Sequence, residues 1–156
     1  MPSQNELDSL YMGFAIRAAK MSKARRKKVG GCLIKHENVI SYGWNGTPSG
    51  EDNNCEDELP DGTLVTKQCV THCELNVYGK LLNSEHPVST ADSTLYVTLS
   101  PCVECAKLIK RSGTTQVVYL EKYRDTSGID FLSQRGVNVR SFILSNSVIY
   151  HLLPWE

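Results

Sequence analysis

Apolar residues recur at three- and four-residue intervals near the start of the chain, which predicts an amphipathic helix over residues 6–22. Its apolar positions are Leu7, Leu10, Tyr11, Phe14, Ala18 and Met21. The basic run KARRKK, at 23–28, is expected to close this helix. The segment VGGCLIKHENVISYGWN, which follows, has the pattern of two short strands around a turn at 36–38.

The remaining pattern alternates between strands and helices. Residues 46–62 are rich in Gly, Pro, Asn and acidic residues and are expected to form a loop. Helices are predicted at 71–82 and 101–113, a loop and helix at 126–136, and strands at 93–100, 115–123 and 137–144. The last twelve residues receive no assignment. This order indicates one α/β domain over 1–156, a three-layer α-β-α sandwich with a mixed, about five-stranded central sheet.

Charge and composition narrow the possible partners and compartment. The chain has 17 basic and 17 acidic residues, so no broad attraction to nucleic acid or to a membrane surface is expected. No apolar run approaches the ~20 residues that span a bilayer, and the N-terminus lacks the pattern of a signal peptide. A cytoplasmic location is expected, where six cysteines are free, metal-bound or catalytic rather than paired in disulfides.

One constellation carries candidate chemistry. His72 and Glu74 stand two positions apart at a predicted helix start, and Pro101 precedes Cys102 and Cys105 at another. Zinc binds imidazole nitrogen and thiolate sulfur in tetrahedral geometry, and three protein ligands leave one position for water. The three ligands would be His72, Cys102 and Cys105, with Ser100 as helix cap and Pro101 as first helical residue. Glu74 would then handle protons beside the metal.

Simpler interpretations exist for each half of this constellation. Thr71 and Glu74 also fit a capping box, which closes a helix start without any catalysis. Cys102 and Cys105 alone could be a redox pair or half of a structural zinc site. The combination of both halves is instead the signature of zinc-dependent nucleobase deaminases, in which the glutamate is the general acid and base.

Three stretches carry a resemblance to a known family: HCELN, TLYVTLSPCVECAKLI and VGGCLIKHENVISYGWNGTPSG. Over roughly residues 7–141 the chain resembles the deoxycytidylate (dCMP) deaminases of the zinc-dependent cytidine deaminase superfamily, most like the phage and bacterial forms. It departs from their pattern at Cys73, where alanine is usual, and at Trp44, where tyrosine is usual. The resemblance implies a cytidine deaminase-like fold and one catalytic Zn²⁺. A second zinc is not expected, because Ala24 stands where some phage relatives have a cysteine ligand.

The resemblance also implies the reaction. It is the hydrolytic deamination of dCMP to dUMP and ammonia, which supplies dUMP for thymidylate synthesis, with Glu74 carrying the proton from zinc-bound water to N3 of the base. Alternatives are deamination of another cytosine nucleotide or nucleoside, such as dCTP or cytidine. A zinc-binding module without catalysis would be expected to lack Glu74 or a ligand, and all four residues are present.

Substrate contacts carry over by position. Asn45 resembles the asparagine that holds the sugar hydroxyl, Tyr123 matches a tyrosine that lines the nucleotide site, and Thr98 and Ser100 border the base. Simpler roles are a turn for Asn45 and an amphipathic strand end for Tyr123. Arg26 is expected to contact a phosphate, although cations after a helix also complement its dipole.

Regulation is implied by the resemblance as well. Many relatives are activated by dCTP with Mg²⁺, inhibited by dTTP, and assemble as hexamers. The effector is expected at the loop from Gly43 to Gly50, with Gly43, Asn45 and Gly46, and with Lys28 near its phosphates. A nucleotide substrate, nucleotide effectors and a homo-hexamer are thus the expected partners, without nucleic acid or membrane, in the host cytoplasm if the gene is a phage's.

Overall fold

The computed structural model describes residues 1–143. Helix α1, Gln4–Ala19, starts with a reciprocal capping box: Ser3 Oγ accepts from the backbone N–H of Glu6, and the Glu6 carboxylate accepts from the N–H of Ser3. The helix ends at Ala19, so the basic run 23–28 lies in the following loop and does not close the helix as predicted. That loop places the cations on the way to the first strand.

The central sheet has five strands, in the order β2-β1-β5-β6-β7. They are β1 Gly30–Lys35, β2 Asn38–Trp44, β5 Thr94–Leu99, β6 Gln116–Glu121 and β7 Asn138–Ser141. Strand β1 pairs antiparallel with β2 and β5, whereas β5, β6 and β7 run parallel. The β1–β2 turn has positive φ at His36 and Glu37, as a two-residue hairpin requires. The mixed five-stranded sheet confirms the predicted fold class.

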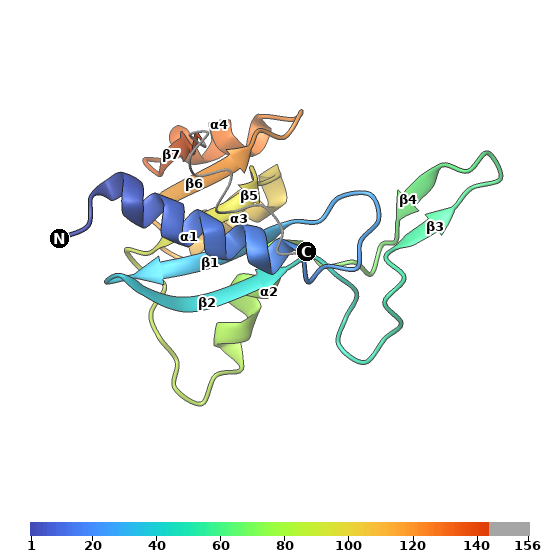
Figure 1. Ribbon diagram of the computed structural model, residues 1–156, viewed down its shortest axis with the longest axis horizontal. Helices are drawn as coiled ribbons and strands as arrows, with labels where there is room; N and C mark the ends of the chain where they lie inside the picture. The colour runs from blue at the N-terminus through green and yellow to red at the C-terminus, as the bar shows by residue number, and fades with distance from the viewer. Residues whose placement is uncertain (144–156) are drawn as a thin grey trace.

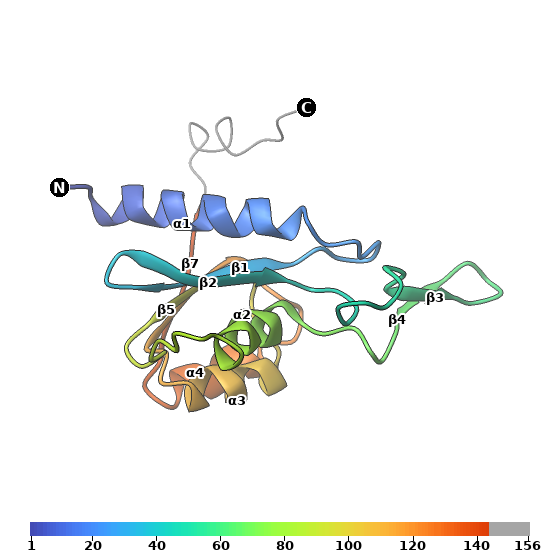
Figure 2. The same cartoon turned by 90° about the horizontal axis from the view of Figure 1, so that it is seen from below.

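Helices cover the two faces of the sheet unequally. Among residues 1–143, α1 is the one helix on its face of the sheet, and α2 Cys73–Leu82, α3 Val103–Arg111 and α4 Ser127–Ser133 lie on the other face (Figure 2). Because successive side chains of a strand point to opposite faces, Cys32 and Ile34 pack under α1 while Leu33 packs under the other helices. The result is the predicted three-layer sandwich with a separate core on each side of the sheet.

A short hairpin projects from the body of the molecule (Figure 1). Its strands are β3 Glu56–Glu58 and β4 Leu64–Thr66, paired antiparallel. The prediction of a plain loop at 46–62 therefore missed β3, because three-residue strands of acidic residues carry no alternating pattern. Among residues 1–143, no helix combines the length and apolar character that a membrane span needs.

Candidate active site

Two helix starts meet at the carboxyl ends of the parallel strands. His72 is the N-cap residue of α2, and Cys102 is the N-cap residue of α3, directly after β5. Cys105 follows in the first turn of α3, so the three-residue spacing puts its sulfur on the same side as that of Cys102. The predictions of a Thr71 capping box and of Ser100 as N-cap are wrong by one or two residues, and neither observed cap residue makes a side-chain capping bond.

The three predicted ligands converge. The Sγ atoms of Cys102 and Cys105 lie 3.7 Å and 3.5 Å from Nδ1 of His72. The ligand atoms of His72, Cys102 and Cys105 all lie within 4.8 Å of one another. Among residues 1–143, this is the cluster of His, Cys, Asp or Glu side chains that could hold a metal ion. Two free helix N-termini also favour negative sulfur here.

The lowered pKa of one cysteine thiol makes the cluster suitable for binding a cation. A hydrogen bond from Cys105 and another from His72 lower the pKa of the Cys102 thiol to about 3. The hydrogen bond to Cys102, together with burial, raises the pKa of Cys105. A divalent cation bound to this cluster would hold both sulfurs as thiolate ligands. One histidine and two cysteines are a donor set that suits zinc.

Glu74 lies in the first turn of α2, and only 4% of its surface is exposed. Burial raises the pKa of its carboxyl group, against the opposing effects of a backbone hydrogen bond and of His72. Its side chain also interacts with the Cys105 thiol. A buried carboxyl group with a raised pKa beside a metal-ligand cluster is suited to take up and release a proton during a reaction.

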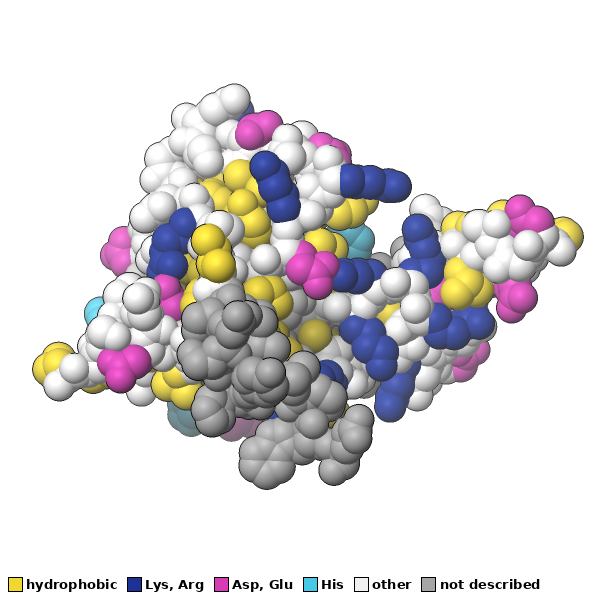
Figure 3. Space-filling model, turned by 45° about the horizontal axis from the view of Figure 1, so that its top comes forward, with side chains coloured by type: hydrophobic (Ala, Val, Ile, Leu, Met, Phe, Trp, Pro, Cys, Tyr) yellow, Lys and Arg dark blue, Asp and Glu magenta, His cyan; other side chains and the backbone are white. Residues whose placement is uncertain are grey.

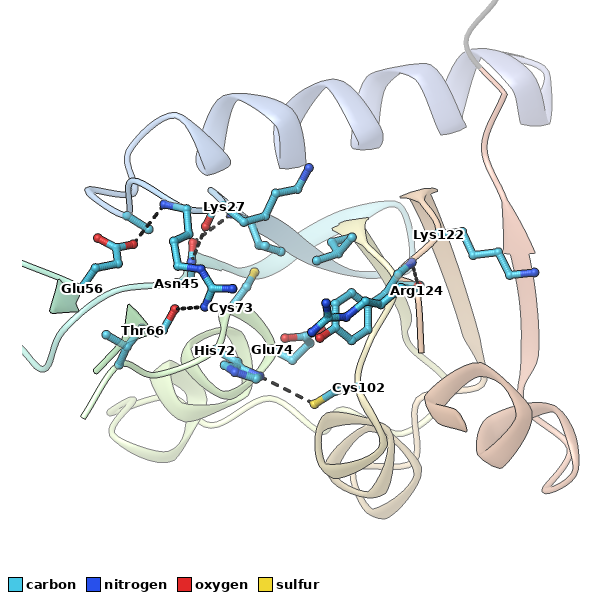
Figure 4. A pocket seen from close by; sticks show the side chains of 17 residues that line it. Lys27, Asn45, Glu56, Thr66, His72, Cys73, Glu74, Cys102, Lys122 and Arg124 are labelled. Carbon is cyan, nitrogen blue, oxygen red and sulfur yellow. Dashed lines mark hydrogen bonds between the residues drawn. The ribbon is translucent and has the colours of Figure 1, made fainter. Parts of the chain in front are cut away.

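A cavity of about 540 Å³ opens above the cluster and is large enough for a small ligand. His72, Cys102 and Glu74 line it, whereas Cys105 is not among the lining residues (Figure 4). One wall comes from the loop before β1 and from the hairpin, and the other from the loop after β6. Four cations line it: Arg26, Lys27, Lys122 and Arg124. Lys and Arg side chains also gather between the hairpin and the body in Figure 3.

The predicted base and sugar contacts are placed unevenly. Ser100 and Asn45 line the cavity, whereas Thr98 is buried and uses its Oγ1 to accept a hydrogen bond from the N–H of Gly30. Ser100 Oγ accepts from the N–H of Tyr123, another lining residue, at 2.7 Å. Asn45 accepts from the N–H of Val29 and donates to the carbonyl of Lys27, both at 2.8 Å. Asn45 thus joins the end of β2 to the basic loop.

Only some of the residues predicted to bind a phosphate or an effector line the cavity. Arg26 lines the cavity and donates to Thr66 Oγ1 at 3.1 Å, but Lys28 is exposed and is not among the lining residues. Gly43 is buried in β2, where a Cβ atom would stand 3.2 Å from the N atom of Val77 in α2. Gly46 forms an isolated bridge with Thr71.

Sequence reasoning missed several lining residues. Lys122 and Arg124 flank the predicted Tyr123 and could have been found as neighbours in the same loop. Glu56 carried no such signal, since it stands among many acidic residues. It is 1% exposed, and its Oε1 accepts from the N–H groups of Arg25 and Arg26 at 2.9 Å and 3.1 Å, which fixes the basic loop against the hairpin.

Gly128, at the start of α4, also supports the site and was not anticipated. A Cβ atom at this position would stand 2.1 Å from the carbonyl oxygen of Pro101 and 2.8 Å from that of Cys102. Only glycine lets α4 pack this closely against the ligand-bearing loop.

Comparisons with known proteins agree with this geometry. Residues 5–121 match the family described as the cytidine and deoxycytidylate deaminase zinc-binding region. The chain is 33% identical over 151 residues to the human deoxycytidylate deaminase, covering 88% of this chain and 80% of the human one. It is 30% identical to the deoxycytidylate deaminase of Enterobacteria phage T4, covering 95% of this chain and 94% of that protein.

A solved structure is similar throughout. The dCMP deaminase from the cyanophage S-TIM5, crystallised in complex with dCMP and dUMP, superposes with a TM-score of 0.81 at 39% identity. The match covers 90% of this chain and all of the cyanophage chain. With the metal-ligand residues assembled at two helix starts beside a buried glutamate, the chain belongs to the cytidine and deoxycytidylate deaminase family.

Proposed function

We propose that this protein catalyses the hydrolytic deamination of dCMP to dUMP and ammonia, with one Zn²⁺ held by His72, Cys102 and Cys105. The observation that carries the proposal is the buried Glu74 beside this cluster, on the floor of a cavity lined by cations. The dCMP deaminase activity of the human, T4 and S-TIM5 relatives supports the choice of substrate.

The chain's own residues account for the proton transfers. A Zn²⁺ ion held by His72, Cys102 and Cys105 would act as a Lewis acid that lowers the pKa of water toward ~7. Glu74 takes the proton that water loses as oxygen adds to C4 of cytosine, and gives it to N3. It then transfers the second proton, from the hydroxyl group on C4, to the amino group, which leaves as ammonia as the C4–N bond breaks and the C4 carbonyl forms. Its buried position keeps bulk water from competing for that proton.

Other groups in the cavity position the nucleotide. Tyr123, Ser100 and Asn45 line the cavity. In this proposal Tyr123 and Ser100 border the base, and Asn45 borders the sugar. Both Asn45 amide atoms already bind backbone groups, but each keeps a further donor or acceptor for a ligand. Arg26 is proposed to contact a phosphate. Because four cations line the cavity, a nucleotide fits it better than free cytidine does, and dCTP is the second candidate substrate.

Regulation is proposed from the resemblance of the 43–50 loop to the family's effector loop. In this proposal dCTP with Mg²⁺ activates and dTTP inhibits, the protein forms a hexamer, and the product feeds thymidylate synthesis. Gly46 and Asn45 stand where the loop leaves β2 next to the cavity wall, so a bound effector could change the substrate site. Lys28, exposed beside this loop, is proposed to contact the effector's phosphates.

The experiment is ammonia release by zinc-loaded protein from dCMP, dCTP, cytidine and deoxycytidine in parallel. The proposal predicts that dCMP has the highest kcat/KM. A higher kcat/KM for dCTP or for a nucleoside would support the deaminase activity but would contradict the assignment of dCMP as the substrate. Titration of the dCMP reaction with dCTP and Mg²⁺, and then with dTTP, tests regulation. The mass of the assembly by light scattering tests the hexamer.

A further inference from the structure

The four cations that line the cavity are not equally available to a ligand. Lys27 forms an ion pair with Glu121, and Arg26 donates to the hydroxyl of Thr66. Neither Lys122 nor Arg124 has a hydrogen-bond acceptor or a carboxylate within ion-pair distance among residues 1–143. Within the described part of the chain, the loop after β6 therefore carries two cavity-lining cations that form neither a hydrogen bond nor an ion pair.

These two side chains point in different directions. In Figure 4 the Lys122 side chain extends away from Glu74, His72 and Cys102, whereas Arg124 is directed back toward Glu74. The Cζ atom of Arg124 lies 5.9 Å from the ring centroid of Tyr123, a contact that favours this orientation. Within residues 1–143, Arg124 thus presents toward the cavity a guanidinium group that has no hydrogen-bond partner. The pKa of the exposed Asp125, which follows it in the chain, is lowered mainly by a hydrogen bond from the N–H of Ser127 and also by the charge of Arg124.

An unpaired guanidinium at the edge of a cavity is suited to a phosphate. Its planar fork donates two parallel hydrogen bonds to a phosphate, which an ammonium group cannot do. Arg26, on the opposite wall, has a donor engaged by Thr66, and its backbone N–H binds the buried carboxylate of Glu56. A phosphate dianion on that side would approach the buried carboxylate of Glu56. The carboxylate beside Arg124 is that of Asp125, which is exposed to solvent and therefore better screened, so the Arg124 wall is the more favourable place for a phosphate.

On the basis of the proposed function, we propose that Arg124 binds the 5′-phosphate of the substrate and so selects a nucleoside monophosphate over a nucleoside. The side chain touches the substrate but not the reacting atoms. Its contribution is therefore the same in the ground state and the transition state, and its loss raises KM more than it lowers kcat. In this assignment the phosphate contact proposed for Arg26 is to a nucleotide effector and not to the substrate.

The test combines removal of the guanidinium with removal of the phosphate. We expect Arg124→Gln to lower kcat/KM for dCMP by about 10- to 100-fold, the effect of losing hydrogen bonds to a charged group, mainly through KM. Its kcat/KM for deoxycytidine stays within about twofold of the wild-type value, because that substrate has no phosphate to lose. Arg111→Gln is the matched control, since Arg111 is exposed at the far end of α3 and does not line the cavity.

Binding of dUMP and deoxyuridine, measured by calorimetry, repeats the comparison without turnover. Arg124→Gln is expected to weaken dUMP binding by a similar factor and to leave deoxyuridine binding unchanged. An equal loss for both ligands, or no loss for either, would overturn the assignment. Failure of the proposed function would show differently, as absence of dCMP turnover by the wild-type protein. A circular dichroism spectrum confirms that the variant is folded, and Arg124→Lys, which keeps the charge but not the fork, is expected to recover only part of the affinity.

Discussion

The carboxylate of Asp8 in α1 accepts two hydrogen bonds from the guanidinium of Arg140 in β7, at 2.6 Å and 2.8 Å. The Tyr96 hydroxyl, in β5 between them, donates a third at 2.6 Å. Asp8 is 2% exposed, so this group ties the lone helix on one face to the last strand, 132 residues along the chain. Burial alone would raise the pKa of Asp8, but the bonds from Arg140, Tyr96 and Gln4 outweigh it, and the pKa is lowered below its ordinary 3.8.

Asp8→Asn is therefore expected to destabilise the fold by about 2 kcal/mol, because it leaves Arg140 without its partner. The lowered folded-state pKa means that the stabilisation is complete above the unfolded-state pKa and is lost as the pH falls through the lower, folded-state value. Urea unfolding at pH 7 and between pH 5 and 3 measures this. Asp57→Asn, an exposed position in β3, is the control and should change stability by less than about 0.5 kcal/mol. Equal effects of both substitutions at pH 7 would show that the buried pair is not stabilising.

The metal cluster predicts which cysteines hold zinc. Cys105→Ser should reduce bound zinc from about one ion per chain to a small fraction, since a hydroxyl is a far poorer ligand than a thiolate. Cys69→Ser should keep its zinc, because Cys69 is exposed and lies outside the cluster. Metal analysis after dialysis against a chelator measures both. Activity that survived complete removal of zinc would instead favour a thiol redox pair at Cys102 and Cys105.

The close packing of Gly128 on the ligand loop gives a further test. Gly128→Ala should shift Pro101 and Cys102, lower stability by about 1–3 kcal/mol and weaken zinc binding at least tenfold. Gly79→Ala is the matched change in α2, where a Cβ atom meets nothing within 4 Å, and it should stabilise the helix by about 0.5–1 kcal/mol. Thermal unfolding and competition with a colorimetric zinc chelator follow both. Wild-type zinc affinity in Gly128→Ala would show that the loop does not depend on this contact.

The sequence predicted the parts of the site that depend on local spacing. His72, Cys102 and Cys105 could be named because zinc ligands at helix starts have characteristic intervals, and Glu74 because it accompanies them. The sheet followed from alternation in the strands, and the hairpin turn from its short connection. Helix ends were predicted less accurately. Ser100 was predicted to cap α3, but its hydroxyl accepts a hydrogen bond from the N–H of Tyr123, and the N-cap residue is Cys102.

Long-range contacts could not be predicted in this way. Glu56 reaches Arg25 and Arg26 across about thirty residues, and nothing local distinguishes it from its acidic neighbours. The sequence also could not show that Arg124 has no ion-pair partner among residues 1–143, because the partners of a cation depend on which loops meet at the cavity. Lys28 and Arg26 looked alike in the basic run, yet only Arg26 faces the cavity.

The central claim is that Glu74 moves the proton in the deamination of dCMP, and Glu74→Gln tests it most directly. The measurement is the rate of ammonia release from dCMP by wild-type and variant protein, each with its zinc content determined. We predict that the variant binds zinc and folds normally but loses about 10²–10⁴-fold in kcat, the usual contribution of a general acid and base. A variant that keeps its zinc and turns over dCMP at the wild-type rate would contradict the account.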